Sequence, residues 1–257
     1  MKPLLKIEGL SVRYLGSSRC ALKNLSFSVS RGEPVAILGK SGSGKSTLLT
    51  AICGLLPSSA QLSGKIELFG AQKKKPKLGK DIAVVFQDPF SAFDPFFSIE
   101  YQALEAFYAW RDGTKEEALE QIMSAFGRVG LKISPSELKK YPFQFSGGML
   151  QRASLGLAIL HNPSLLLLDE PTSALDAPRK LEFVRLLSSL VIQMEMGMVV
   201  ATHDLPFALA VCKRFLVVED GTIMFDGDPK ELLRRDEKAQ NIAIVNAFFE
   251  QTRFLKS

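Results

Sequence analysis

Apolar and polar residues alternate along the first part of the chain. Residues 4–14 (LLKIEGLSVRY) alternate, and residues 22–38 alternate before they become continuously apolar from Val35 to Leu38. A period of two is typical of a half-buried strand, and an unbroken apolar run is typical of a strand buried on both faces. Residues 48–56 then follow a helical period. The pattern predicts strands, a short connection and a helix.

The middle of the chain favours helices. Residues 98–110 and 114–130 are rich in helix formers, and the second stretch opens with Thr114, with Glu117 three residues on. That spacing is a capping box, in which the two residues bond each other's backbone N–H groups at the start of a helix. We interpret residues 88–160 as a helical insertion in an α/β domain.

Strands and helices alternate around that insertion. Two short strands are expected as a pair at 63–70 and 82–88, and an unbroken apolar strand, SLLLLDE, at 164–170. The later expected elements are a helix at 178–197, a strand at 198–204, another helix, a strand pair at 214–228 and a helical tail over 229–257. The order predicts one α/β domain with a mixed or parallel sheet and an N-terminal antiparallel part.

Bulk composition excludes several classes. The 257 residues are 46% hydrophobic, which is globular and not disordered. There is no apolar run of ~20 residues and no signal peptide at the start, so we expect a cytoplasmic protein. The three cysteines form no CxxC pair, which favours buried reduced thiols over zinc or iron–sulfur. The basic run at 73–77 is a solvated loop or a contact to anionic headgroups.

A phosphate-binding loop follows the buried strand. GKSGSGKS fits G-x-x-x-x-G-K-[ST] between a strand and a helix. Its backbone N–H groups and the helix N-terminus attract phosphate, Lys45 reaches the β- and γ-phosphates, and the Ser46 hydroxyl serves Mg²⁺. The predicted ATP-binding residues of this P-loop are Gly39, Ser41, Gly42, Ser43, Gly44, Lys45, Ser46 and Thr47.

Two acids end the second buried strand. Asp169 is placed to hold Mg²⁺, and Glu170 to polarise the attacking water. Because neighbouring strand residues point to opposite faces, the two are not expected to share a proton. A pair of solvated acids is the alternative.

A second anion-binding helix start lies at Ser146-Gly147-Gly148. The P-loop, this SGG, LLLLDEPTSALD and THD occur in an order that resembles the ATP-binding cassette (ABC) family over residues 4–228. The resemblance implies that the SGG caps the γ-phosphate of ATP held by a partner cassette, in a head-to-tail dimer. A plain helix cap is the alternative, and Met149 stands where the family most often has glutamine.

The resemblance assigns four further residues. Gln87 matches the glutamine that senses Mg²⁺ and water, and Asp176 matches the acid that crosses to the other subunit. His203 matches the switch histidine near the γ-phosphate, and Tyr14 is a candidate for stacking on adenine. Each has a plainer alternative: a structural glutamine, a helix cap, a satisfied polar histidine and strand packing, respectively.

Within the family, the chain resembles peptide and nickel importers. It has one cassette, no coiled coil, no zinc module and no fused membrane domain, and FQDPFSAFDPFFSI and SGGMLQR are similar to that branch. The resemblance implies an ATPase at the cytoplasmic face of the membrane, with permease subunits, a second cassette and, indirectly, a solute-binding protein as partners, and no nucleic acid. The cargo is a peptide, nickel or a metal chelate.

An apolar surface in the insertion is implied for the permease. It would comprise Phe90, Phe93, Phe96 and Phe97, which could instead pack the insertion's own core. Two alternatives to the importer remain open: a soluble ABC-type ATPase accessory factor, such as one for iron–sulfur assembly, and a nucleotide-binding regulator that barely hydrolyses ATP.

Overall fold

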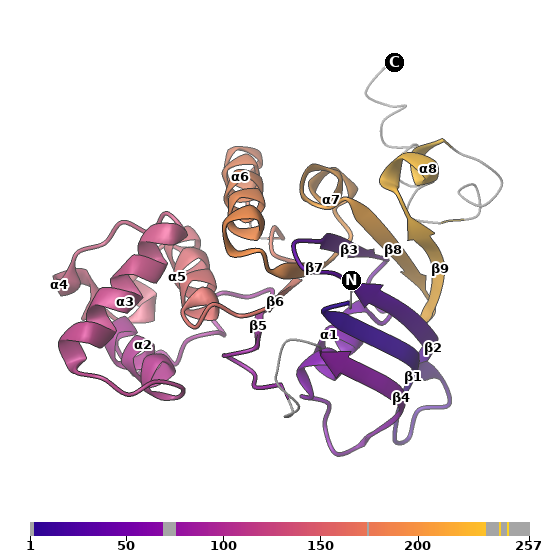
Figure 1. The fold of residues 1–257 in the computed structure, drawn as a ribbon, viewed down its shortest axis with the longest axis horizontal. Helices are drawn as coiled ribbons and strands as arrows, with labels where there is room; N and C mark the ends of the chain where they lie inside the picture. The colour runs from indigo at the N-terminus through magenta and orange to yellow at the C-terminus, as the bar shows by residue number, and fades with distance from the viewer. Residues whose placement is uncertain (1–2, 69–75, 174, 235–241, 243–245, 247–257) are drawn as a thin grey trace. The chain divides into compact units, whose positions relative to one another are not determined.

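The structure is a computed structural model that describes residues 3–68, 76–173, 175–234, 242 and 246 (Figure 1). It divides into two compact units, one formed by residues 1–70 with 197–257 and the other by residues 71–196. We call them the P-loop unit and the helical unit, respectively.

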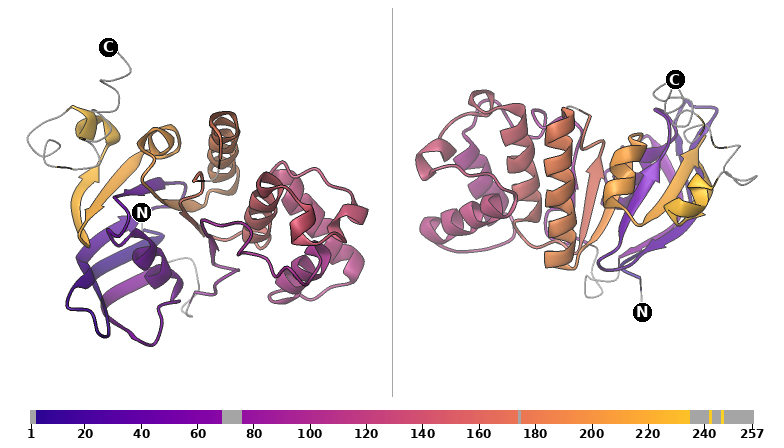
Figure 2. Two further views of the ribbon diagram at one scale, coloured as in Figure 1. Left: turned by 180° about the vertical axis from the view of Figure 1, so that it is seen from behind. Right: turned by 90° about the horizontal axis from the view of Figure 1, so that it is seen from above.

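An antiparallel sheet forms the N-terminal part of the P-loop unit. Strands β1 (Leu5–Tyr14), β2 (Cys20–Val29) and β4 (Ala60–Leu68) pair in the order β2-β1-β4 and lie side by side in Figures 1 and 2. Buried residues alternate with more exposed ones along β1, as the sequence predicts.

A mostly parallel sheet carries the P-loop. Strands β7 (Gly197–Thr202), β3 (Pro34–Leu38) and β8 (Arg214–Glu219) run parallel, and β9 (Thr222–Gly227) pairs antiparallel with β8. Every residue of β3 and β7 is buried, because helices α1 (Lys45–Cys53) and α7 (Leu205–Val211) pack on this sheet.

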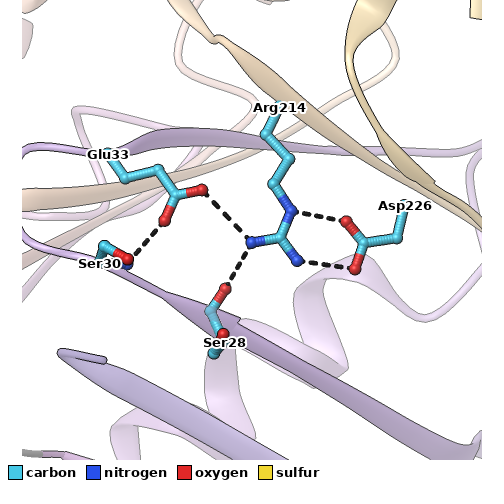
Figure 3. Close-up of polar contacts among 5 residues, drawn as sticks. All are labelled: Ser28, Ser30, Glu33, Arg214 and Asp226. Carbon is cyan, nitrogen blue, oxygen red and sulfur yellow. Dashed lines mark hydrogen bonds and ion pairs between the residues drawn. The ribbon is translucent and has the colours of Figure 1, made fainter. Parts of the chain in front are cut away.

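An arginine joins the two sheets of the P-loop unit (Figure 3). The Arg214 guanidinium donates to both carboxylate oxygens of Asp226 at 2.6 and 2.7 Å, to Ser28 O at 2.9 Å and to Glu33 Oε1 at 3.3 Å. The hydrogen bonds to Asp226 are the main cause that raises the pKa of Arg214. Since β8, β9 and β2 all contribute, the contact fixes the antiparallel sheet against the strands beside the P-loop.

The helical unit contains a parallel strand pair and a group of helices. Strands β5 (Ile82–Val85) and β6 (Leu165–Asp169) are parallel. The helices are α2 (Ile99–Tyr108), α3 (Lys115–Arg128), α4 (Pro135–Leu138), α5 (Gly147–Ile159), α6 (Ala177–Met194) and a 3₁₀ turn at Pro142–Gln144. The capping box of Thr114 and Glu117 begins α3, as predicted. Gly156 lets α5 approach α3, because a Cβ there would lie 2.5 Å from Phe126.

Two predictions need correction. The strands expected as a pair at 63–70 and 82–88 exist, but β4 pairs with β1 whereas β5 pairs with β6. Of the three cysteines, only Cys212 is buried; Cys20 and Cys53 are half-buried, although burial still raises the pKa of the Cys53 thiol to about 11.

The end of the chain and the basic run are only partly described. The predicted helical tail contributes α8 (Pro229–Leu233), and most of its remaining residues lie outside the described part of the chain. Residues 73–75 of the basic run also lie outside it, while the Lys77 ammonium sits 4.9 Å from the centre of the Trp110 ring.

Candidate functional site

The P-loop runs from β3 into α1 as predicted. Its first glycine has no room for a side chain, since a Cβ on Gly39 would lie 2.3 Å from Ser43 Oγ and 2.4 Å from Val218 O. Gly44 has φ +107°, and a Cβ there would lie 2.6 Å from Ala21 O. The loop therefore requires glycine for reasons internal to the chain.

The lysine of the loop folds back over it. Lys45 is buried, and its ammonium donates to Gly39 O at 2.8 Å and to Lys40 O at 3.1 Å. The positive charge is thus held against the backbone curve of the loop, the position in which a P-loop lysine attracts phosphate. Ser46, the predicted Mg²⁺ ligand, is exposed at the start of α1.

A buried hydroxyl in the loop supports the fit to phosphate. Ser43 is 6% exposed, and its Oγ has no hydrogen-bond partner among the described residues. A buried polar atom without a partner is costly, and such atoms mark sites where a ligand completes the bonding. With the glycine-rich loop and Lys45, this donor fits a polyphosphate.

Two predicted residues lie beside the loop in the same unit. Leu38 and Thr202 are register partners at the ends of β3 and β7, so His203 follows at the strand end next to the P-loop. Tyr14 ends β1, and its Oη lies 3.3 Å from Thr47 Oγ1 in α1. Tyr14 therefore contacts α1 through a hydrogen bond, in addition to the strand packing that was its alternative role.

A cavity of about 650 Å³ opens beside the loop, and the sequence interpretation missed most of its lining. The lining includes Arg13, Tyr14, Arg19, Lys23, Gly42 and Gly221. Gly221 also supports the loop, because its N–H donates to Ser43 O at 3.0 Å. Asp220-Gly221 is a turn dipeptide between two strands, so the turn was detectable from the sequence. Its contact with residues far along the chain was not.

The acid pair lies in the helical unit. Asp169 is the buried last residue of β6, and Glu170 is half-buried with φ +45°, in the left-handed region. The strand ends before Glu170, so strand alternation does not set the direction of its side chain, and the prediction of opposite faces had no basis in the strand geometry. Val85 pairs in register with Leu168, and Gln87 follows, exposed, two residues after β5.

The SGG segment begins α5. Ser146 is its N-cap, and Ser146 Oγ accepts from Met149 N at 3.3 Å, so the helix-cap role is present. The glycines that follow are not crowded. A Cβ on Gly147 would meet only Phe90 Cε2, at 3.7 Å, and one on Gly148 would have no described atom within 4 Å.

Basic residues surround this helix start. A cavity of about 360 Å³ is lined by Ser146, Gly148, Arg152 and Arg179, among others. Arg152 donates to Val129 O at 2.8 Å and pairs with Glu182 at 3.1 Å. Asp176 caps α6 by accepting from Arg179 N at 3.0 Å, which confirms its helix-cap role; its side chain is exposed.

The aromatic residues after Gln87 divide into two kinds. Phe90, Phe96 and Phe97 are 50%, 82% and 44% exposed, but Phe93 is 5% exposed. The predicted surface therefore lacks Phe93, which packs in the core. Two exposed pairs stack nearby, Phe97 on Tyr101 and Tyr141 on Phe143.

Within the described residues, no three His, Cys, Asp or Glu side chains are grouped so that they could hold a metal ion. None of the helices within the described ranges has the length and hydropathy to span a bilayer.

Comparison with known proteins agrees with this geometry. The family model described as ABC transporter matches residues 22–173. The dipeptide transport ATP-binding protein DppD of Escherichia coli (strain K12) is 32% identical over 257 residues, which cover 96% of this chain and 79% of DppD. The oligopeptide transport ATP-binding protein OppD of the same organism is 31% identical, covering 95% and 75%.

Solved structures show the same fold. CbiO1 from Clostridium perfringens, described as part of the ABC transporter complex cbiONQ, superposes with a TM-score of 0.75 at 29% identity, covering 93% of each chain. The cassette MJ0796, described as a dimer in a post-hydrolysis state bound to ADP and Pi, gives 0.74 at 25% identity, covering 87% of this chain and 98% of that one. The expected α/β fold is confirmed, and the chain belongs to the ABC transporter family, as one of its ATP-hydrolysing cassettes.

Proposed function

We propose that this chain is the ATP-hydrolysing subunit of a peptide importer. The relatives that cover nearly all of the chain are named for dipeptide and oligopeptide transport. These names favour peptide over nickel among the cargoes that the sequence left open. They also favour the importer over the soluble accessory factor.

ATP binding is assigned to the P-loop unit. The loop amides, Lys45 and the buried Ser43 hydroxyl hold the phosphates, since together they offer positive charge and donors without a competing side chain. Tyr14 stacks on adenine at the cavity beside the loop. Ser46, Gln87 and Asp169 would hold Mg²⁺, which when bound offsets charge on the β- and γ-phosphates.

Hydrolysis is assigned to three polar residues. Glu170 orients the attacking water and accepts its proton, because a carboxylate is the base expected at the end of this strand. Gln87 positions the same water, and His203 bonds the γ-phosphate oxygen as charge develops there. The order of the motifs along the chain, which resembles that of the ABC family, supports these three roles.

The main observation that supports a head-to-tail dimer is the open space at Gly147 and Gly148. Glycine at a helix start lowers helix stability relative to alanine, and nothing in the described chain needs these positions small. A partner molecule that approaches the backbone does need it. We propose that Ser146–Gly148 bind the γ-phosphate of ATP held by a second cassette, with Asp176 reaching that subunit.

The exposed aromatic residues are assigned to the permease. Phe96, Phe97 and Tyr101 (the aromatic surface) present apolar area that is unusual outside an interface. Docking there places the cassette peripherally, at the cytoplasmic face of the membrane. Cargo reaches the permease through a solute-binding protein, and no nucleic acid takes part.

Mixing two variants tests the dimer and its ATP sites. Gly147→Asp sets a carboxylate where the γ-phosphate approaches, and Lys45→Ala removes the phosphate contact in the P-loop. In a mixed dimer both lesions fall in one composite site, so ATP-dependent dimerisation should return above that of either variant alone. The true partner cassette is used if the dimer is heteromeric, and dimers are counted by light scattering.

The isolated Gly147→Asp chain supplies the control. Its own P-loop should bind ATP with parental affinity, because Gly147 belongs to the partner's site in this proposal. If that chain loses ATP binding, the SGG acts on its own nucleotide and the head-to-tail assignment is wrong. Co-purification of permease subunits separates the importer from the soluble accessory factor, and steady ATPase activity excludes the regulator.

A further inference from the structure

The loop that carries the aromatic surface has no regular secondary structure. Residues 89–98 connect Asp88 to the start of α2, and Phe96 within them is 82% exposed. Phe93 holds the loop by burial, but residues 94–97 are exposed, so burial does not hold the shape of that stretch. Asp88 holds the start of the loop by accepting from Phe90 N and Ser91 N, and a second group of hydrogen bonds holds the backbone from Asp94 to Phe97.

One side chain makes three of those bonds. Gln102 Oε1 accepts from Asp94 N at 2.8 Å, and Gln102 Nε2 donates to Asp94 O and to Phe97 O, both at 2.9 Å. Gln102 lies in α2, whose N-cap Ser98 accepts from Tyr101 N. The amide therefore ties the loop to a rigid helix, five to eight residues further along the chain.

The remaining bonds close the turn around Phe96. Phe96 N donates to Asp94 Oδ1 at 2.8 Å, and Phe97 N donates to Asp94 O at 3.4 Å. Phe97 then stacks on Tyr101, with ring centres 4.7 Å apart. Two neighbouring residues of α2, Tyr101 and Gln102, thus hold the loop through an aromatic contact and an amide contact.

The chemistry selects an amide at position 102. Only a side chain that both accepts and donates can satisfy an N–H and two carbonyl oxygens together. A carboxylate of the same shape would keep the acceptor but turn its second oxygen toward two carbonyls. A methionine of similar length would remove all three bonds without adding charge.

We propose that Gln102 is a positioning residue, which fixes the aromatic surface in the shape that a permease segment binds. This inference rests on the proposed function, because it takes that surface as the docking site. A surface that is already ordered loses less entropy on binding, so the amide acts on the affinity for the permease and on coupling. It has no role in ATP binding or in hydrolysis by the isolated cassette.

The test compares Gln102→Glu and Gln102→Met with Phe96→Ala. Gln193→Glu is the matched control, because it makes the same change on α6, where the Gln193 amide contacts only Ser189 Oγ among the described residues. The probes are the permease subunits that co-purify with this chain, co-expressed with it and purified in detergent. Three quantities are measured. They are amide exchange at residues 94–97, retention of the cassette by the permease, and ATPase activity with and without the permease.

Gln102→Met should speed exchange of the Asp94 amide about fivefold or more, the effect of losing one net hydrogen bond. Gln102→Glu should speed it as well, because its second oxygen is repelled by the Asp94 and Phe97 carbonyls and the side chain moves away. Retention by the permease should fall about tenfold, as is expected also for Phe96→Ala, and the permease should no longer stimulate the ATPase. Basal ATPase activity and the thermal midpoint should match those of Gln193→Glu. Together these results support the proposal.

Two results would overturn it, and they are distinguishable. If exchange at residues 94–97 is unchanged, or if it rises while permease retention stays parental and Phe96→Ala still lowers retention, Gln102 does not position the surface. If Phe96→Ala itself retains the permease normally, the docking assignment is wrong and the inference falls with it.

Discussion

Two glycine-containing segments of this chain differ in how closely other atoms pack around their glycines. In the P-loop, a Cβ on Gly39 or Gly44 would lie within 2.6 Å of a backbone carbonyl oxygen. At the start of α5, Gly147 and Gly148 have room for a methyl group. The first pair is explained by the chain's own packing. The chain's own packing does not explain the second pair, so we infer that a molecule outside the chain uses it.

The comparison separates two reasons for which a protein uses glycine. A crowded glycine lets the loop fold, and the chain alone then defines the binding surface. An open glycine leaves backbone N–H groups accessible, and only an incoming ligand makes use of them. The P-loop is thus complete within one subunit, whereas the SGG needs a second one under the proposed function.

Alanine substitution at the two kinds of glycine should give the largest contrast. Gly44→Ala forces a methyl group against Ala21 O in a left-handed conformation, so we expect a loss of roughly 3–5 kcal/mol in the free energy of unfolding. Gly148→Ala should change that free energy by at most about 1 kcal/mol, in the stabilising direction, since alanine favours a helix. Chemical denaturation measures both.

The same two alanine variants should also differ in their affinity for ATP. Gly44→Ala should also lose ATP affinity, whereas Gly148→Ala should bind ATP as the parent does. Equal losses of stability for the two variants would show that crowding does not distinguish the segments.

A substitution that lowers ATP turnover without changing ATP affinity should be found outside the P-loop. Glu170→Gln keeps the shape of the side chain but removes the base, so we expect turnover to fall about 10²-fold or more while ATP affinity stays near that of the parent. Single-turnover hydrolysis and equilibrium binding separate the two quantities. Asp169→Asn serves as the comparison, because it should weaken Mg²⁺-dependent binding as well. Parental turnover in Glu170→Gln would assign catalysis to another residue.

Local patterns predicted much of the fold and the P-loop. The buried strand β3, the following glycines and α1 are contiguous in the sequence, so their motif is visible without the fold. The capping box of α3 is local for the same reason. The resemblance to the family supplied the role of the SGG toward a partner's ATP and the assignments of Gln87, Asp176, His203 and Tyr14.

Contacts between distant residues were not predictable in this way. The partner of β4 is β1 and not β5, because strand pairing is decided by the whole sheet. Phe93 and Phe96 are three residues apart and share a type, yet one is buried and the other exposed. The three bonds of Gln102 depend on a loop conformation that no periodic pattern encodes.

The smallest predicted effect separates two roles of Asp176. Its side chain caps α6, so Asp176→Ala should lower the free energy of unfolding by about 1 kcal/mol. Asp176→Asn should keep the cap, since asparagine caps as well as aspartate, and stability should stay within a few tenths of a kcal/mol. The asparagine variant therefore removes the charge alone. If Asp176 also reaches the second cassette, ATP-dependent dimerisation measured by light scattering should weaken in Asp176→Asn at unchanged stability. Parental dimerisation in that variant would leave Asp176 as a helix cap only, and the open glycines at the start of α5 as the sole support for the contact between subunits.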